Sequence, residues 1–175
     1  MKIMKFLIKN NFSQMGTTLI ELLLYMGILS ILLTALTSIF VSALDVQSES
    51  NATSSVEQDG NYILARLNYD IHRAQSISIP PSNGATAGNF QLVINGVNYT
   101  YDINGDNDLI LTNSLGANSL NNFGTNISNF SVERFGNTGG IENTLKINFT
   151  ATGREQRTSV LETKNFEMNI SLRRQ

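Results

Sequence analysis

Cysteine is absent from these 175 residues, and only 15% of them are charged. Without cysteine, the chain can form neither a disulfide framework nor a thiolate nucleophile or Cys-ligated metal site. The only histidine is His72, and the sequence contains no His-Glu-x-x-His zinc helix and no phosphate-binding glycine motif. Because no catalytic constellation can be assembled from these residues, we expect a protein that is not an enzyme.

Basic residues are missing from a long part of the chain, since none occurs between Lys9 and Arg66. Acidic side chains outnumber basic ones by 14 to 12, which gives a net charge of −2. This balance argues against a protein that coats nucleic acid through its phosphates. A local basic patch would need several separate arginines to converge, whereas scattered solvated charges are the simpler interpretation, so DNA is not an expected partner. The arginines concerned are Arg66, Arg73, Arg154, Arg157, Arg173 and Arg174.

An uncharged apolar run extends from Leu22 to Leu44, directly after a single acid, Glu21. As a helix this run would be ~35 Å long, enough to cross the ~30 Å hydrocarbon core of a membrane. A carboxylate beside such a segment is costly unless it is paired or hydrated, so Glu21 requires a positive partner. If the chain were cut after Gly16, the new α-amino group of Thr17 would lie about one helical turn away and could be that partner.

The residues around Glu21 resemble the type IV prepilin signature. A short leader with Lys2, Lys5 and Lys9 precedes Gly16, and the sequence Thr-Thr-Leu-Ile-Glu then leads into the long apolar run. The resemblance extends with specificity only from Gly16 to about Leu44. The similarity of the later part of the chain to minor pilins and J-type pseudopilins is loose.

The resemblance implies that a prepilin peptidase cuts between Gly16 and Thr17 and methylates the new amine. It implies that Glu21 pairs with the N-terminal amine of a neighbouring pilin or pseudopilin subunit. It also implies an inner-membrane assembly platform as partner, with the chain in the cytoplasmic membrane before assembly and in an extracytoplasmic pilus or pseudopilus afterwards. Thr17 replaces the usual large apolar residue, and Ser38 stands where many major pilins have proline, which favours a minor subunit. The residues do not decide between a pilus, type II secretion and DNA uptake for competence.

Other interpretations of the N-terminal segment remain open. A secretory signal peptide has a shorter apolar region, of about 7–15 residues. A plain signal anchor fits the length and places the leader lysines in the cytoplasm, but it gives no reason for Glu21. The alternative function is therefore a single-pass, membrane-anchored extracytoplasmic binding domain, such as a calcium-dependent adhesin that keeps residues 1–16.

A helical period continues beyond the apolar run. Ile63, Leu67, Ile71 and Ala74 fall on one face, and the helix must stop before Pro80-Pro81. We expect one long helix from about Thr18 to Ser76, loosened near Gly60. On its exposed edge, Asp70 would pair with Arg66 and Arg73, which are spaced for i, i+4 and i, i+3 contacts.

After the two prolines, the pattern changes to alternation. Two Asn-Gly pairs, at 95–96 and 104–105, separate apolar runs at 90–94, 97–103 and 109–111, which predicts a three-stranded meander with type I′ turns. We expect one face of this meander to meet the helix stripe Ile63/Leu67/Ile71. That face consists of Val97, Tyr99, Tyr101 and Ile103.

Residues 112–126 are expected to form a loop, and strand patterns resume in three later runs. About six strands in one antiparallel sheet follow the helix, so the fold class is α+β, the type IV pilin fold, with half of the helix transmembrane. The expected domains are the leader 1–16, the transmembrane and assembly helix 17–44, the periplasmic half of the long helix 45–79, and the β-sheet domain 80–175. The later strand runs contain Phe130 and Val132, then Leu145, Ile147, Phe149 and Ala151, and finally Phe166, Met168, Ile170 and Leu172.

One segment has the spacing of a metal loop. Oxygen side chains at alternate positions around Gly105 resemble the first half of a calcium loop. The later bidentate acid of such a loop is missing before Glu133, and acidic residues beside Asn-Gly are equally ordinary turn chemistry. No cofactor is otherwise expected. If calcium binds, its ligands would be Asp102, Asn104, Asp106 and Asp108.

Overall fold

The computed structural model describes residues 18–136, 143–154 and 161–171, in which one helix is followed by nine strands. The expected α+β class is confirmed, and the architecture is compatible with a pilin-like fold. The chain divides into two compact units, Met1–Ala43 and Leu44–Gln175. The division falls inside the helix, so each unit is described by itself.

Helix α1 spans Leu19–Arg73 and continues through Gly60 without a break. The expectation that it would reach Ser76, and that 45–79 would be helical throughout, is wrong, because Ser76–Ile79 form strand β1. The backbone explains the earlier end. The amide of Ala74 donates to Ile71 O, and the amide of Gln75 donates across to Val93 O at 2.8 Å, so strand pairing replaces the next helical turn.

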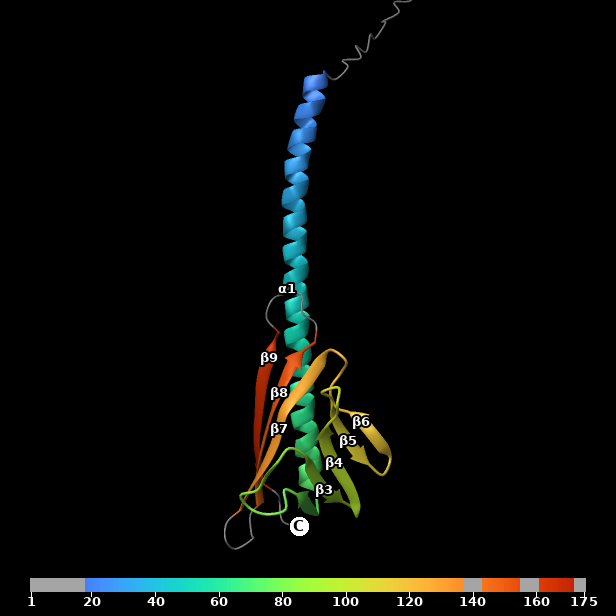
Figure 1. Cartoon of the computed structure of the whole chain (residues 1–175), viewed down its shortest axis with the longest axis vertical. Coiled ribbons are helices and arrows are strands. Elements are labelled where there is room, and N and C mark those ends of the chain that lie inside the picture. The colour runs from blue at the N-terminus through green and yellow to red at the C-terminus, as the bar shows by residue number, and fades with distance from the viewer. Residues whose placement is uncertain (1–17, 137–142, 155–160, 172–175) are drawn as a thin grey trace, which may run out of the picture. The chain divides into compact units, whose positions relative to one another are not determined.

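The first sheet contains five antiparallel strands in the order β1-β3-β4-β5-β6. The central meander, in which β3, β4 and β5 pair in sequence order, is the one expected from the two Asn-Gly pairs. In Figure 1 these strands run from olive to yellow on one side of the second unit. The strands added to β1 are β3 (Phe90–Ile94), β4 (Val97–Ile103), β5 (Leu109–Asn113) and β6 (Gly116–Ser119).

The second sheet contains four antiparallel strands in the order β2-β7-β8-β9. The sequence predicted a single sheet, so the division into two sheets is a correction. The three long runs predicted as strands are strands, whereas the final predicted residue, Leu172, lies outside the described residues. The strands are β2 (Thr86–Ala87), β7 (Thr125–Gly136), β8 (Asn143–Gly153) and β9 (Thr163–Ser171).

The two Asn-Gly turns differ in structure. Ile94 pairs with Val97, and Asn95 and Gly96 have φ values of 50° and 75°, so the first turn is the two-residue hairpin that was expected. The second is not, because Ile103 pairs with Leu109 across a five-residue loop, 104–108. In that loop the positive φ belongs to Asn107, at 62°.

The expected loop at 112–126 is also wrong in part. Residues 112–113 end β5, residues 116–119 form β6, and Thr125 begins β7. All four β6 residues are exposed, so this strand has no apolar alternation from which it could have been predicted.

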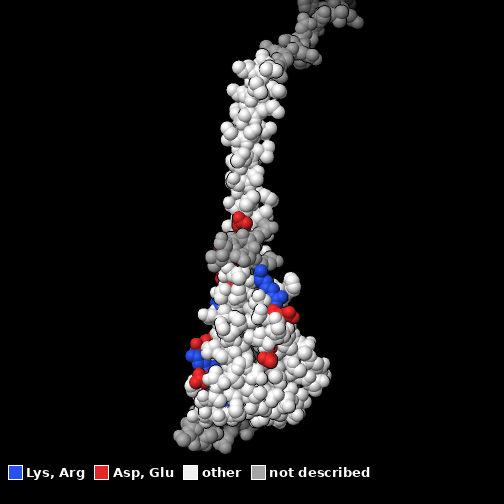
Figure 2. Space-filling model, viewed as in Figure 1, with Lys and Arg blue, Asp and Glu red and all other residues white. Residues whose placement is uncertain are grey.

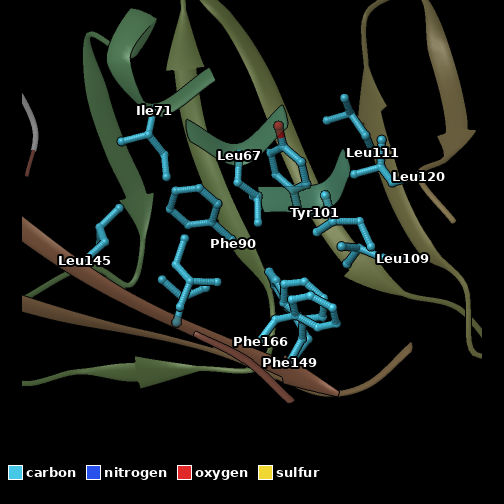
Figure 3. Close-up of a cluster of buried hydrophobic side chains, with 14 of the residues drawn as sticks. Leu67, Ile71, Phe90, Tyr101, Leu109, Leu111, Leu120, Leu145, Phe149 and Phe166 are labelled. Atoms are coloured by element: carbon cyan, nitrogen blue, oxygen red, sulfur yellow. The ribbon is translucent and has the colours of Figure 1, made fainter. Parts of the chain in front are cut away.

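The hydrophobic core of the second unit lies between α1 and both sheets. Ile63, Leu67 and Ile71 are fully buried there, as expected, together with Tyr101 of the predicted strand face. Tyr99 and Ile103 pack against this core, and Val97 is half-buried. Figure 3 shows Tyr101 and Phe90 close to Leu67, and the stacked rings of Phe149 and Phe166.

Gly60 does not loosen the helix, as was expected, but allows close packing against it. It is buried, and a Cβ added there would lie 2.0 Å from the ring of Phe166. The ring of a β9 residue therefore packs directly on the helix backbone, which requires glycine at this position.

Candidate assembly surface

The α1 residues of the first unit form a continuous apolar surface. Every residue from Leu22 to Ala43 is exposed, and Leu19 and Ile20 are 79% and 76% exposed. The face shown in Figure 2 carries no lysine or arginine along this stretch. The helix is long and apolar enough to cross a membrane by length and composition, which is consistent with single-pass anchoring. Burying this surface requires lipid or other helices.

Four hydroxyl groups within this apolar surface bind the backbone of the helix itself. All four donate to the carbonyl oxygen four residues earlier, at distances between 2.8 and 3.1 Å. A polar side chain bonded in this way needs no water, so these four hydroxyls can enter lipid or a helix bundle without losing a partner. The residues are Ser30, Thr34, Thr37 and Ser38.

Glu21 lies in the first turn of α1 and is half-buried. Its amide donates weakly to Thr18 Oγ1 at 3.4 Å, and its Oε1 accepts a hydrogen bond from the Tyr25 hydroxyl at 3.0 Å. An acid in the first turn interacts favourably with the helix dipole. Within the described residues, no ion pair is formed by this carboxylate.

Tyr25 was not identified from the sequence as a contact of Glu21. The i, i+4 spacing on a predicted helix was the available signal. The processing residues predicted from the sequence, Gly16 and Thr17, lie outside the described residues.

The four predicted calcium ligands lie at the end of β4 and in the loop 104–108, where they have other partners. Asn104 Oδ1 accepts the amides of Asp106 and Asp108 at 3.0 and 2.8 Å, which is an Asx turn. Asp102 Oδ1 accepts the amide of Ile103. Among the described residues, no group of three or more His, Cys, Asp or Glu could hold a metal ion. Calcium binding therefore stays an untested prediction of the sequence.

Asp108 forms a salt bridge that fixes this loop to the second sheet. Arg154 Nη2 lies 2.6 Å from Asp108 Oδ1 and also donates to Asp106 O at 3.0 Å. Asn121 Nδ2 donates to the same Asp108 oxygen. Arg154, one of the arginines considered for a basic patch, thus forms an internal contact with the segment considered for calcium. Arg157, Arg173 and Arg174 lie outside the described residues.

Asp70 is a buried carboxylate where the sequence predicted an exposed helix edge. Its side chain is 0% exposed, and Oδ2 accepts hydrogen bonds from Arg66 Nε at 2.8 Å and from the Tyr101 hydroxyl at 2.5 Å. Arg73 Nη1 is 4.0 Å from Oδ1. Burial, followed by the hydrogen bond to Asp70, raises the pKa of Tyr101 above its ordinary value. Asp70 therefore links α1 to β4 of the first sheet.

Asp59, about three helical turns before Asp70 on α1, is a second buried carboxylate. It was not identified from the sequence. Its oxygens accept the amide of Asn122 at 2.9 Å, Asn122 Nδ2 at 3.1 Å and the Thr125 hydroxyl. Asp59 therefore links α1 to the start of β7. The single histidine, His72, is exposed on α1.

Comparisons with protein-family models, with curated proteins and with solved structures give no match. The structure shows an apolar helix that is long enough to cross a membrane and has one acid in its first turn. The described strands after it form two antiparallel sheets.

Proposed function

We propose that this chain is a minor type IV pilin or pseudopilin, a structural subunit that assembles through its apolar helix. Prepilin peptidase cleaves it between Gly16 and Thr17, and it then joins other subunits on an inner-membrane assembly platform. It begins as a single-pass protein of the cytoplasmic membrane and ends in an extracytoplasmic filament.

The observation that carries this proposal is the position of Glu21. It is the only charged residue between Thr18 and Leu44, and it opens a helix segment whose apolar side chains are all exposed. A plain membrane anchor gains nothing from a carboxylate there and bears its desolvation cost. In a helix bundle, by contrast, this carboxylate can pair with a cationic group of a neighbouring subunit, because the neighbours present the same N-terminal helix segment.

Pairing Glu21 with the α-ammonium group of a neighbouring subunit would determine the axial register of the bundle. At ~4 Å and an effective dielectric near 20, the attraction is up to ~4 kcal/mol before desolvation is subtracted. A subunit inserted out of register would leave both charges unpaired. Cleavage provides the ammonium group and removes the three leader lysines, which would otherwise hold the helix at the cytoplasmic face.

The test is the substitution Glu21→Gln, which keeps the size of the side chain and its contact with Tyr25 but removes the charge. We expect membrane insertion to be unchanged and incorporation into filaments to fall at least ~10-fold, because the register-selecting pair is lost. Incorporation is measured by immunoblotting of sheared filaments against the membrane fraction of the producing cell.

The matched control is Glu57→Gln, which removes an acid from an exposed position of the same helix. Incorporation of Glu21→Gln at the level of this control would contradict the proposal. Mass spectrometry gives an independent readout, because a protein from the producing cell with Met1 still attached would lack the amine that Glu21 needs.

A further inference from the structure

We propose that the second sheet binds a neutral oligosaccharide in an open hollow on its outer face, across β7, β8 and β9. This inference goes beyond the proposed function and does not depend on it, because the hollow lies entirely in the second unit. Its volume of about 420 Å³ falls in the ~300–1,000 Å³ range of small-ligand sites. The polar side chains that line it are Asn129, Lys146, Asn148, Thr150, Asn165 and Glu167.

The hollow faces away from the hydrophobic core because side chains alternate along each strand. Phe149 is buried in the core, so Asn148 and Thr150 on either side of it project from the opposite face of β8. In the pairing with β9, Asn148 lies opposite Glu167 and Thr150 lies opposite Asn165. Most of the side chains that β8 presents on this outer face are uncharged amides and hydroxyls. They are Thr144, Lys146, Asn148, Thr150 and Thr152.

A β-bulge in β7 contributes one side of the hollow. The pairing of β7 with β8 shifts between Ser128 and Ser131, and within this shift Asn129 has a φ of 53°. A bulge changes the direction of a side chain relative to regular alternation, and such insertions are frequent beside functional sites. Asn129 Nδ2 lies 3.4 Å from Thr150 Oγ1. The bulge therefore brings the Asn129 amide to the side chains of β8.

The amides that line the hollow keep free hydrogen-bonding capacity. Thr150 Oγ1 donates to Asn165 Oδ1 at 2.8 Å, which occupies the acceptor of Asn165 but not its amino group. Within the described residues, the Asn148 side chain forms no hydrogen bond. A side-chain amide offers both a donor and an acceptor, and a sugar hydroxyl is also both. Two adjacent hydroxyls of a sugar ring can therefore bond to the two ends of one amide.

The charges at the hollow favour a ligand without charge. Lys146 Nζ lies 3.0 Å from Glu167 Oε1, and the hydrogen bond from Lys146 lowers the pKa of Glu167, so the pair is ionised and mutually neutralised. Glu133, opposite Lys146 on β7, adds a negative charge outside the hollow, which disfavours an anionic ligand.

The lining also favours a polar ligand over an apolar one. Phe149 and Phe166 are the apolar residues that line the hollow, and they are only 1% and 7% exposed. An apolar peptide side chain would therefore gain little buried surface there. The neutral, hydroxyl-rich surface of an oligosaccharide matches the exposed groups better.

The test measures binding of neutral tetrasaccharides to the full chain by isothermal titration calorimetry, in a detergent without a sugar headgroup. The probes are cellotetraose, maltotetraose and N-acetylchitotetraose, with tetragalacturonate as an acidic comparison. We expect saturable binding of at least one neutral probe, with an affinity that salt does not change, because an uncharged ligand is not screened. Binding of no neutral probe would overturn the inference, and so would tighter binding of tetragalacturonate.

Two substitutions assign the binding to this hollow. Asn148→Ala and Asn165→Ala each remove one lining amide and should weaken binding at least ~fivefold, the effect of about one hydrogen bond. The matched control is Asn98→Ala, which removes an exposed asparagine from β4 of the first sheet and should bind as the wild type does. Equal affinities in all three variants would overturn the inference.

Two further readouts keep the result unambiguous. The thermal midpoints of the variants, followed by circular dichroism, identify any loss of binding that is caused by unfolding, and Asn148→Gln then replaces Asn148→Ala as the test substitution. Incorporation into filaments should be the same for Asn148→Ala and the wild type. A wild-type chain that binds the sugar but never enters filaments would contradict the proposed function alone, whereas a chain that enters filaments without binding would contradict this inference alone.

Discussion

At the scale of single residues, the second unit depends on two buried carboxylates that its sequence does not reveal. Asp59 and Asp70 lie on the same face of α1 as Ile63 and Leu67. Asp70 accepts a hydrogen bond from Tyr101 of the first sheet, and Asp59 accepts one from Thr125 of the second. The 3.6-residue period predicted the apolar members of this face correctly. It assigned Asp70 to an exposed edge, because a carboxylate is buried only when donors from distant parts of the chain meet it. Those donors become known only from the fold.

Tyr101 provides a prediction about pH at this scale. Its pKa is raised in the folded protein by burial and by the hydrogen bond to Asp70, so the phenol stays neutral where an unfolded chain would ionise it. Its contribution to stability is complete below about pH 10 and is lost as the pH rises further, by ~1.4 kcal/mol per pH unit. In urea unfolding at pH 8 and pH 11, Tyr101→Phe should lose less stability between the two pH values than the wild type does.

Tyr62→Phe is the matched control, because it removes a phenol that is 51% exposed. Between pH 8 and pH 11, this variant should lose as much stability as the wild type does. Tyr101→Phe should also be less stable than the wild type at pH 8 by about 1–3 kcal/mol, because Asp70 loses a buried hydrogen-bond donor. If all three proteins lost the same stability between pH 8 and pH 11, the assigned role of Tyr101 would be contradicted.

At the scale of elements, alternation in the sequence predicted the strands that are buried on one face. Leu145, Ile147 and Phe149 were placed on one face of a strand, and all three are buried in β8. The same method could not find β6, whose residues are all exposed, or β2, which has only two residues. Nor could it divide the strands between two sheets, since pairing depends on contacts that no local pattern contains. For the candidate site, the sequence identified the apolar run and Glu21, but it missed Tyr25.

The two Asn-Gly turns give a prediction at this scale, because they are identical in sequence and different in backbone. Gly96 has a φ of 75°, whereas Gly105 is not among the residues with positive φ. An alanine at position 96 would be strained, so Gly96→Ala should destabilise the protein by about 1–2 kcal/mol. Gly105→Ala should have little effect or be slightly stabilising, because alanine restricts the unfolded chain. Both positions have open space for a Cβ, so packing does not complicate the comparison.

The measurement is the free energy of unfolding from urea titration of the two variants and the wild type. Equal destabilisation at the two positions would mean that both turns are two-residue type I′ hairpins, as the sequence alone suggests. Destabilisation by Gly96→Ala alone would support the five-residue loop at 104–108, which is organised by Asn104.

At the scale of the whole molecule, the exposed apolar surface and the buried core lie in different parts of the chain. All residues of the buried hydrophobic core lie at or after Val56, within the unit Leu44–Gln175. From Leu22 to Ala43, by contrast, every residue is exposed. The apolar character of the first unit therefore contributes nothing to the core of the second, and its burial depends on lipid or on other copies.

This separation predicts that a chain beginning at Leu44 folds without the first unit. It keeps Asp59, Asp70 and the core stripe, and the described residues that it loses from Leu22 to Ala43 are all exposed. We expect the fragment 44–175 to be soluble without detergent, because the long apolar surface is gone. Its thermal unfolding should be cooperative, with a midpoint within a few degrees of the full chain in detergent, as followed by circular dichroism. A fragment that melts without a transition, or far below the full chain, would show that residues 19–43 contribute to folding itself and would contradict the division of roles along α1.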